Sequence, residues 1–364
     1  MLTIRANAFA DEMGYDVTLL TYQQNNAPFP YSLSSKVKCV DLNVKLYTAH
    51  KYPYPFRYIK KLQLRRQLSN AIRHFLKEAQ ADIVVCTDKD AYEQRALIKA
   101  HTTEKLVVEA HTGIIDHEFQ VRQTTNIIRR FLAIIHLNHL KETVARFDGL
   151  IALTPDDSHQ WGAFVRKTVI PNCLPDYPEQ AAGTGQTHKR IIAVGRLNYQ
   201  KGFDLLLQAW QTVQERHTDW RLDIFGDGEE LASLSTLLPP RAAIHPSTPN
   251  IFAEYMCSDF LVCSSRWESF GLIIIEAMAC GLPVVAFDCD NGPRNIIDDG
   301  EDGLLASNGD TADLAEKMCQ MISQQAQRHK MGAAARQHAT RFKTEKIIGQ
   351  YDLFYKSLCQ PKQQ

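Results

Sequence analysis

The sequence predicts an α/β protein built from two doubly wound, mainly parallel sheets, and three observations support this. Short apolar runs alternate with segments of helical periodicity along the chain, which is typical of strands joined by helical crossovers. A proline-rich joint at 170–178 and a soft polar segment at 180–187 interrupt the alternation. The length of 364 residues suits two or three domains of ordinary size.

The first half of the chain contains five short apolar runs that we expect to be strands. These runs are 17–21, 37–40, 83–86, 106–109 and 149–153. Helices are expected at about 57–80, 90–101, 122–146 and 155–163. The first fourteen residues are also predicted to form a helix, which Gly14 closes.

The second half repeats the alternation and adds two cations to a loop. A strand at 191–194 ends at Gly195, and the next loop carries Arg196 and Lys201 before a helix over 204–210. Glycine permits close approach of a ligand to the backbone. Arginine offers a planar fork and lysine a mobile point charge, so the pair suits two neighbouring phosphate groups. The alternative is an ordinary loop with solvated basic residues.

Two glutamates form a second group of interest. Glu268 follows a predicted buried strand in 259–265, and Glu276 lies inside the next predicted helix. Glu268 is therefore expected at the carboxyl end of a strand, where open α/β sheets bind ligands. Two glutamates eight residues apart are also common on ordinary protein surfaces.

The loop between the two glutamates opens that helix. Its residues Phe270, Gly271 and Leu272 precede a run that stops at Gly281, and a strand is predicted over 282–287. The free N–H groups of a helix start form a site for phosphate. We therefore expect this loop to contribute main-chain donors to an anion site.

A histidine marks the corresponding place in the first half. His111 follows the predicted strand 106–109, and Gly113 keeps the loop open behind it. The imidazole is expected at the carboxyl end of a strand, facing the ligand cleft. A surface histidine without function is the alternative.

Together these motifs resemble the donor-binding half of retaining nucleotide-sugar glycosyltransferases of family 4, in the GT-B superfamily. The matched segments are 195–202, 225–228, 268–285 and 292–305. The resemblance covers about 188–345 closely and the first half more loosely. It implies an α/β GT-B fold with two Rossmann-like doubly wound domains facing across a cleft.

The same resemblance implies the domain boundaries. Residues 1–172 are expected to form the acceptor-side domain, and 173–345 the nucleotide-sugar donor domain. The last segment, 346–364, is expected to contain a helix that crosses back to the first domain.

The resemblance also implies a donor-binding set, namely Gly195, Arg196, Lys201, Phe270, Gly271, Leu272 and Glu276. Arg196 and Lys201 would neutralise the leaving diphosphate, helped by the amides around Gly271 and Leu272. Glu276 would accept hydrogen bonds from the ribose hydroxyls.

Two residues are expected to act in catalysis. Glu268 would hold the transferring sugar and favour positive charge at its anomeric carbon, and His111 would contact the donor sugar or an acceptor hydroxyl. The residues offer no convincing nucleophile, which suits a front-face substitution; a covalent role for Glu268 is the alternative.

One departure from the family lies at the start of the chain. Such enzymes open with a strand and a glycine-rich loop, whereas residues 1–14 already read as the helix after that loop. The first domain is therefore expected to be truncated at its start. This leaves a non-catalytic partner subunit as an alternative function. A nucleotide-sugar epimerase is another, and a phosphorylase of the superfamily would need a much longer chain.

We expect neither a metal nor a bound cofactor. Asp288 and Asp290 match the Asp-x-Asp pattern that holds manganese in another glycosyltransferase fold, but Asp88 and Asp90 match it too, so the pattern is weak. Nine cysteines without CxxC spacing read as free thiols in a reducing compartment. A cytoplasmic location is therefore expected.

Formal net charge is zero, yet one helix is strongly basic. Its cations are Arg57, Lys60, Lys61, Arg65, Arg66, Arg73 and Lys77, with no acidic residue before Glu78. Apolar residues interleave with them, which predicts docking on the anionic inner face of a membrane and fits a lipid-linked or polysaccharide acceptor. A solvated outer helix is the alternative. Nucleic acid is not expected, because no aromatic stacking platform accompanies the charge.

Overall fold

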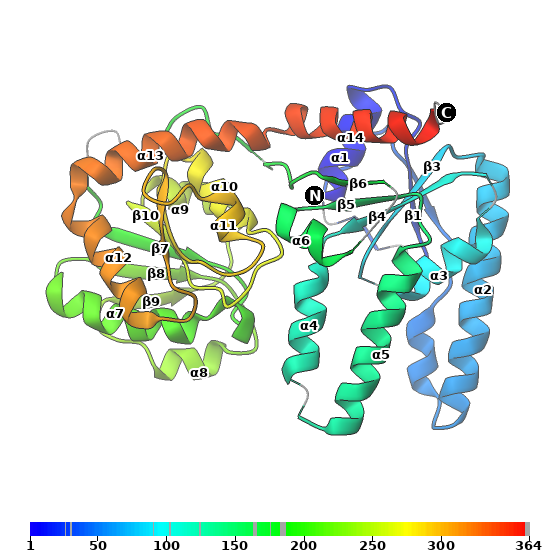
Figure 1. Ribbon diagram of the computed structural model, residues 1–364, viewed down its shortest axis with the longest axis horizontal. Coiled ribbons are helices and arrows are strands. Elements are labelled where there is room, and N and C mark those ends of the chain that lie inside the picture. The colour runs from blue at the N-terminus through cyan, green and yellow to red at the C-terminus, as the bar shows by residue number, and fades with distance from the viewer. Residues whose placement is uncertain are drawn as a thin grey trace. The chain divides into compact units, whose positions relative to one another are not determined.

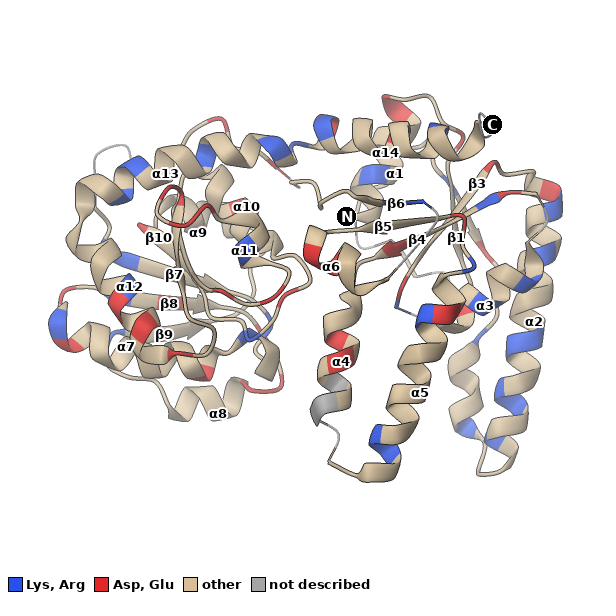
Figure 2. Cartoon of the chain, in the orientation of Figure 1, with Lys and Arg blue, Asp and Glu red and all other residues tan. Residues whose placement is uncertain are grey.

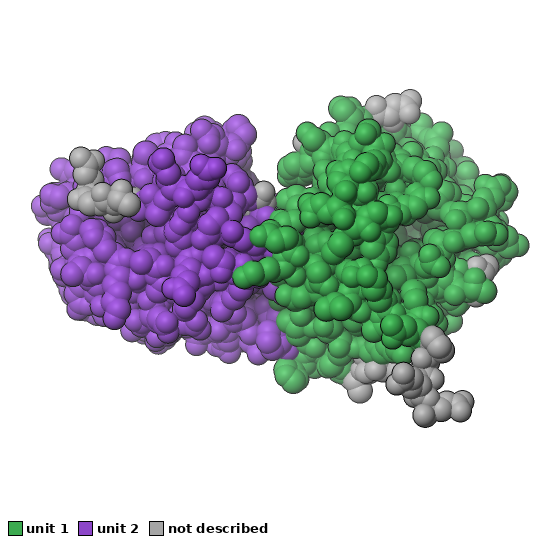
Figure 3. All heavy atoms as spheres, turned by 90° about the horizontal axis from the view of Figure 1, so that it is seen from above, with its two compact units in different colours: residues 1–153, 157–170, 344–364 green, residues 154–156, 171–343 purple. Residues whose placement is uncertain are grey.

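The chain forms two compact units (Figure 3). The computed structural model describes residues 1–25, 27–29, 31–89, 91–101, 103–123, 125–162, 166–174, 176–182 and 187–360. Unit 1 comprises 1–153, 157–170 and 344–364, and unit 2 comprises 154–156 and 171–343. The chain thus passes into unit 2 within the proline-rich joint. Part of the expected soft segment, 183–186, lies outside the described residues.

Unit 1 contains two parallel sheets (Figure 1). Strands β1 and β2 pair with each other, and the second sheet has the order β3-β4-β5-β6. The strands are β1 (Thr18–Thr21), β2 (Lys38–Asp41), β3 (Ile83–Thr87), β4 (Lys105–Ala110), β5 (Gly149–Ala152) and β6 (Lys167–Val169). The sequence did not predict β6, because three residues are too short to show a pattern.

Helices flank these sheets. They are α1 (Leu2–Asp11), the 3₁₀ helix η1 (Leu46–Lys51), α2 (Phe56–Ala79), α3 (Ala91–Ala100), α4 (Gly113–Gln123), α5 (Ile127–Val144), α6 (Pro155–Gln160) and α14 (Thr344–Cys359). The helix expected at 122–146 was wrong at its start: α4 precedes it, and α5 begins after Asn126, whose side chain accepts from the N–H of Arg129 at 3.1 Å. An N-cap of this kind starts a new helix.

The apolar side of the basic helix α2 is not free. Leu64, Leu68, Ile72 and Leu76 are all buried, and they pack with residues of α3 and η1, among them Leu97. This apolar stripe of α2 therefore covers the core of unit 1, and contact of its basic side with a membrane stays a prediction. No helix in the described part of the chain is both long and apolar enough to cross a bilayer.

Unit 2 is built on one six-stranded parallel sheet of order β12-β11-β10-β7-β8-β9. Its strands are β7 (Arg190–Val194), β8 (Arg221–Phe225), β9 (Ala242–His245), β10 (Phe260–Cys263), β11 (Val284–Phe287) and β12 (Gly303–Ala306). The chain runs outward from β7 to β9, then returns to β10 on the other side of β7. The strand order thus reverses between β7 and β10, which in open α/β sheets is the place where ligands bind.

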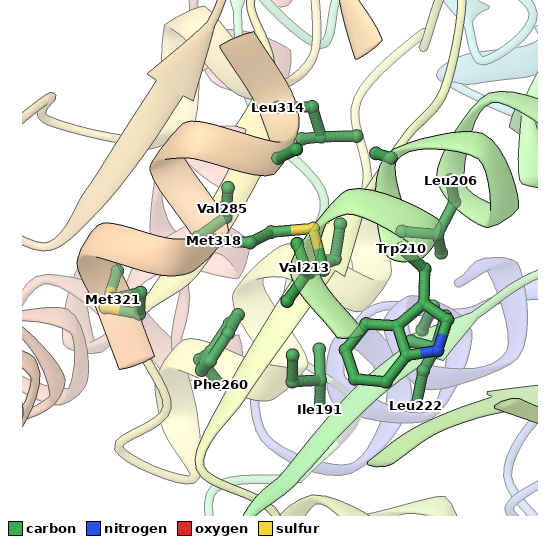
Figure 4. Close-up of a cluster of buried hydrophobic side chains, with 14 of the residues drawn as sticks. Ile191, Leu206, Trp210, Val213, Leu222, Phe260, Val285, Leu314, Met318 and Met321 are labelled. Atoms are coloured by element: carbon green, nitrogen blue, oxygen red, sulfur yellow. The ribbon is translucent and has the colours of Figure 1, made fainter. Parts of the chain in front are cut away.

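Helices cover both faces of this sheet (Figure 1). They are η2 (Tyr199–Lys201), α7 (Phe203–Arg216), α8 (Leu231–Thr236), α9 (Ile251–Met256), α10 (Leu272–Ala279), α11 (Pro293–Ile296), α12 (Thr311–Ser323), α13 (Gln325–Ala339) and η3 (Thr340–Phe342). On one face, Trp210 of α7 and Met318 of α12 pack against strand residues such as Phe260 (Figure 4). The indole N–H of Trp210 donates to the carbonyl of Pro240 at 3.1 Å, so this large side chain is buried without an unpaired donor.

A buried ion pair joins α1 to the larger sheet of unit 1. Arg5, only 6% exposed, donates a short hydrogen bond to Glu109 of β4. The guanidinium also lies 4.6 Å from the ring centroid of Tyr351, and the hydroxyl of Tyr355 lies 3.4 Å from Glu109. Burial acts to raise the pKa of Glu109, but Arg5 and His111 lower it to about 2.

Replacing Arg5 with methionine should destabilise unit 1. The change leaves the Glu109 carboxylate buried without its cation, which typically costs about 3–5 kcal/mol. Because the pKa of Glu109 is lowered in the fold, its stabilising effect in the wild-type protein is present above about pH 4.3 and fades as the pH falls towards about 2. Calorimetric melting at neutral pH measures the loss. The matched control is Arg216→Met, whose exposed pair with Glu316 should matter little. Equal melting temperatures of the Arg5→Met and Arg216→Met variants would contradict a stabilising role for the buried pair.

Candidate functional site

The reversal of strand order in unit 2 brings together two loops that the sequence singled out. Lys201 follows β7, Glu268 follows β10, and the lysine Nζ donates to the glutamate Oε1 at 2.5 Å. Both side chains are largely buried, with the lysine 19% and the glutamate 7% exposed. Burial acts to lower the pKa of Lys201, but the nearby Glu268 carboxylate raises it, so the lysine is charged at neutral pH.

The position of Glu268 is set from three sides. Its Oε1 also accepts from the hydroxyl of Ser265 at 2.7 Å, and its backbone forms a bridge with Asn291. Gly292 lies so close that a Cβ there would meet the Cβ of Glu268 at 2.5 Å and the carbonyl of Phe270 at 2.6 Å. A side chain at position 292 would therefore push the carboxylate away.

The loop that carries the cations depends on glycine. Gly202 has φ +61°, and a Cβ there would lie 2.2 Å from the carbonyl oxygen of Ser264, so only glycine allows the two loops to touch. Gly195 faces the aliphatic stem of Lys201, whose Cδ is 3.3 Å from an ideal Cβ position. Arg196 is exposed to solvent. The loop thus presents one largely buried and one exposed cation.

Helix α10 begins directly after Glu268. Gly271 is its N-cap, with φ +102°, and Leu272 is its first residue. The side chain of Phe270 is buried and packs edge-on against Phe342 at a centroid distance of 5.8 Å. Its ring belongs to the core, so residue 270 offers a ligand its main chain. A helix start leaves N–H groups without partners inside the helix; in α10 the N–H of Ile274 already donates to the carbonyl of Gly271 at 3.0 Å.

Glu276 lies one turn inside α10, in surroundings unlike those of Glu268. Its Oε2 accepts from the hydroxyl of the fully buried Tyr255 at 3.2 Å. Burial raises the pKa of Glu276, and the bond from Tyr255 opposes this only in part. This carboxylate is therefore suited to accept further hydrogen bonds from neutral donors.

His111 lies in unit 1, at the start of α4. The buried carboxylate of Asp88 accepts from the backbone N–H groups of His111, Thr112 and Gly113 at 2.9–3.0 Å and so fixes the loop. The imidazole Nε2 lies 2.8 Å from Glu109 Oε2. Because Glu109 is ionised, it accepts from Nε2 and leaves Nδ1 for another partner.

The Asp-x-Asp carboxylates are held by an arginine. Arg294 lies 2.9 Å from Asp288 and 3.3 Å from Asp290. Within the described residues, one other cluster has metal-ligand proximity, formed by Asp298, Asp302 and His338. There the imidazole Nδ1 lies 2.9 Å from Asp302 and 3.3 Å from Asp298, which ties the loop before β12 to α13.

Sequence reasoning missed several supporting residues. Ser265 and Tyr255 each hold one of the two glutamates, and Asn291 bridges the backbone of Glu268. Ser265 lies three residues before Glu268, a spacing that is recognisable from sequence. Tyr255 comes from α9, and only the packed structure brings it to α10. Glu109 lies two residues before His111, and this short separation is also visible in the sequence.

Residues 179–338 match the family described as Glycosyl transferases group 1. An uncharacterised glycosyltransferase of Haemophilus influenzae is 27% identical over 95% of this chain and 92% of its own length. The amylovoran biosynthesis glycosyltransferase AmsD of Erwinia amylovora is 31% identical over 56% of this chain and 60% of its own length.

Solved structures share the fold at low identity. Sucrose-phosphate synthase from Thermosynechococcus elongatus superposes with a TM-score of 0.75 at 19% identity, over 97% of this chain and 91% of that one. Anabaena HepE, solved with UDP and glucose, superposes with a TM-score of 0.70 at 17% identity, over 98% of this chain and 95% of that one. The family match over 179–338 supports a glycosyltransferase, and the solved structures show that the chain shares their fold. The predicted fold class, with two Rossmann-like units of parallel sheet, is thereby confirmed.

The close approach at Gly292 generates a test of how tightly Glu268 is held. Gly292→Ala should lower stability by about 1–3 kcal/mol, as overpacking does, because the new Cβ meets Glu268 and the carbonyl of Phe270. Thermal melting measures the change. The control is Gly349→Ala in α14, where a Cβ meets nothing within 4 Å, so that helix should become slightly more stable. Unchanged melting of Gly292→Ala would mean that the loop yields easily.

Proposed function

We propose that the chain transfers a sugar, with retention of configuration, from a nucleoside-diphosphate donor to a polysaccharide or lipid-linked acceptor. One observation carries the proposal: Lys201 and Glu268 meet at the point where the strand order of unit 2 reverses. A cation for the leaving diphosphate and a carboxylate for the sugar are thus adjacent.

The ion pair leaves both partners with bonding capacity. An ammonium group has three N–H donors, and one of those of Lys201 is used by Glu268. The others are available to a diphosphate, with Arg196 and the N–H groups at the start of α10 as further donors. Within the described part of the chain, Lys201 and Ser265 both donate to Oε1 of Glu268. The other carboxylate oxygen, Oε2, would then accept a hydrogen bond from a sugar hydroxyl.

Glu276 is assigned to the nucleoside. It lies one helical turn beyond the phosphate-binding end of α10, about 6 Å along the axis at 1.5 Å per residue. That separation suits a ribose joined to the diphosphate. Tyr255 orients the carboxylate from behind, so the ribose hydroxyls would meet a fixed acceptor.

The surroundings of Glu268 support retention without a covalent intermediate. A carboxylate oxygen that accepts bonds from both Lys201 and Ser265 is a weak nucleophile. The same group stabilises positive charge at an adjacent anomeric carbon. His111 would contact the sugar or acceptor. No metal is required in this scheme, because Lys201 and Arg196 supply the positive charge.

The donor class is the first thing to test. The Anabaena neighbour was solved with UDP and glucose, which makes UDP-sugars the first panel to incubate with the protein. Release of UDP together with a free or transferred sugar of unchanged anomeric configuration supports the proposal. Conversion of one UDP-sugar into another indicates an epimerase, and binding without turnover indicates a non-catalytic subunit.

The donor clamp can be tested by removing each cation. Arg196→Ala and Lys201→Ala should each lower turnover about 10²-fold or more, because a preorganised donor to the departing diphosphate is lost. Lys189→Ala, which removes an exposed lysine paired with Asp219, is the matched control and should retain full activity. Transfer should persist in chelator. Full activity of both clamp variants, or dependence on added manganese, would refute the clamp.

The two glutamates should respond differently to neutralisation. Glu276→Gln keeps the shape but loses a charged acceptor, so nucleoside diphosphate should bind more weakly by roughly 1.5–3 kcal/mol. Glu268→Gln should leave that affinity nearly intact and depress transfer. Titration calorimetry and a transfer assay separate the effects, with the exposed Glu316→Gln of α12 as control. Equal loss of nucleotide affinity in both variants would contradict the assignment.

A further inference from the structure

The first three turns of α5 carry an unusual number of exposed apolar side chains. Ile127 is 84% exposed, Ile128 72%, Phe131 62% and Leu132 57%, and Ile135 continues the stripe. Their spacing places them along one broad side of the helix. The buried residues of α5 come only at its far end, at Leu140, Thr143 and Val144. The start of the helix therefore projects from the core of unit 1.

Water-exposed apolar surface of this extent marks a binding surface. Single exposed apolar residues are normal on proteins, whereas contiguous patches indicate a partner or a membrane. In this stretch the pattern is the reverse of that in the later turns of α2, where Leu64, Leu68 and Leu76 are buried. We call residues 127–135 the α5 tip.

Charge on and near the α5 tip is positive only. Arg129 and Arg130 lie within it and are exposed, and no acidic residue occurs between Glu118 and Glu142. Figure 2 shows basic residues at the start of α5 and along α2. The surface thus combines apolar groups with cations, the composition of helices that lie in the headgroup region of anionic bilayers.

The start of α2 extends the same character. Tyr58, Ile59 and Leu62 in its first turns are exposed, and Lys60 and Lys61 lie among them. Helix α2 packs on α3, and α3 packs on α5. In Figure 1 the N-terminal ends of α2 and α5 lie at the same lower edge of unit 1. Both ends are therefore able to meet one flat surface.

We propose that the α5 tip, supported by the first turns of α2, docks unit 1 on an anionic membrane surface. The isoleucines and Phe131 would enter the boundary between headgroups and acyl chains, while Arg129 and Arg130 bind lipid phosphates. This surface belongs to unit 1, whereas the proposed donor site belongs to unit 2, so the inference stands apart from the chemistry of transfer.

A second copy of the chain fits this surface less well. A twofold contact through the α5 tip would bring Arg129 and Arg130 of both copies into one apolar interface. The segment from 119 to 141 offers no carboxylate to pair with them, and unpaired buried charges oppose association. Lipid phosphates supply that missing negative charge.

Vesicle flotation with the full chain tests the proposal. The wild-type protein should bind vesicles of phosphatidylcholine with about one third phosphatidylglycerol at 0.1 M salt. Binding should weaken on pure phosphatidylcholine and at 1 M salt, where the Debye length falls from about 10 Å to about 3 Å. The double variant Ile128→Ser/Phe131→Ser should bind at least about tenfold more weakly, since two apolar side chains no longer enter the bilayer.

Two controls identify the cause of any change. Leu353→Ser/Leu237→Ser removes two leucines that are 70% and 53% exposed elsewhere on the chain, and should bind as the wild type does. Arg129→Gln/Arg130→Gln should lose most of the salt-dependent part of binding. UDP affinity should be equal in all variants. Failure of the wild type to float at 0.1 M salt would overturn the proposal. Vesicle binding by Ile128→Ser/Phe131→Ser equal to that of the wild type would also overturn it. A wild-type protein that is dimeric, with a variant that is monomeric, would overturn it as well.

Discussion

The ion pair between Lys201 and Glu268 connects loops that are 67 residues apart in the chain. It forms because β7 and β10 are neighbours in the sheet and both strands end at the same edge. Buried ion pairs contribute little net stability, since desolvation offsets attraction. The pair matters through geometry: it places a cation and a carboxylate within hydrogen-bonding distance on two rigid strand ends. Gly202 makes this approach sterically possible.

The two glutamates of the site illustrate how surroundings distinguish identical side chains. Glu268 receives a cation and a hydroxyl, whereas Glu276 receives only the hydroxyl of Tyr255 and has its pKa raised by burial. A carboxylate beside a lysine stays charged and interacts with developing positive charge, while one in an apolar setting is better used to accept bonds from neutral hydroxyls. This difference supports the separate roles proposed for the two glutamates.

Unit 1 departs twice from the usual distribution of side chains. Arg5 is buried against Glu109, and Ile127 is almost fully exposed. Buried charges and exposed apolar patches are the informative exceptions to normal burial. The buried pair of Arg5 and Glu109 orders the strand end next to His111, because Glu109 also contacts the imidazole. The second exception lies at the start of α5, where Ile128 and Phe131 are exposed as well.

The sequence by itself determined the α/β class and most strands and helices, because periodicity and glycine positions are local properties. It also identified the chemical groups of the site, namely Lys201, Glu268 and Glu276. Only the tertiary structure decided that Lys201 pairs with Glu268, because that contact depends on the strand order of the sheet. It also decided that α2 buries Leu64, Leu68 and Leu76 while α5 exposes Ile127 and Ile128. Both helices are apolar and basic in sequence, and burial depends on which neighbour packs against each.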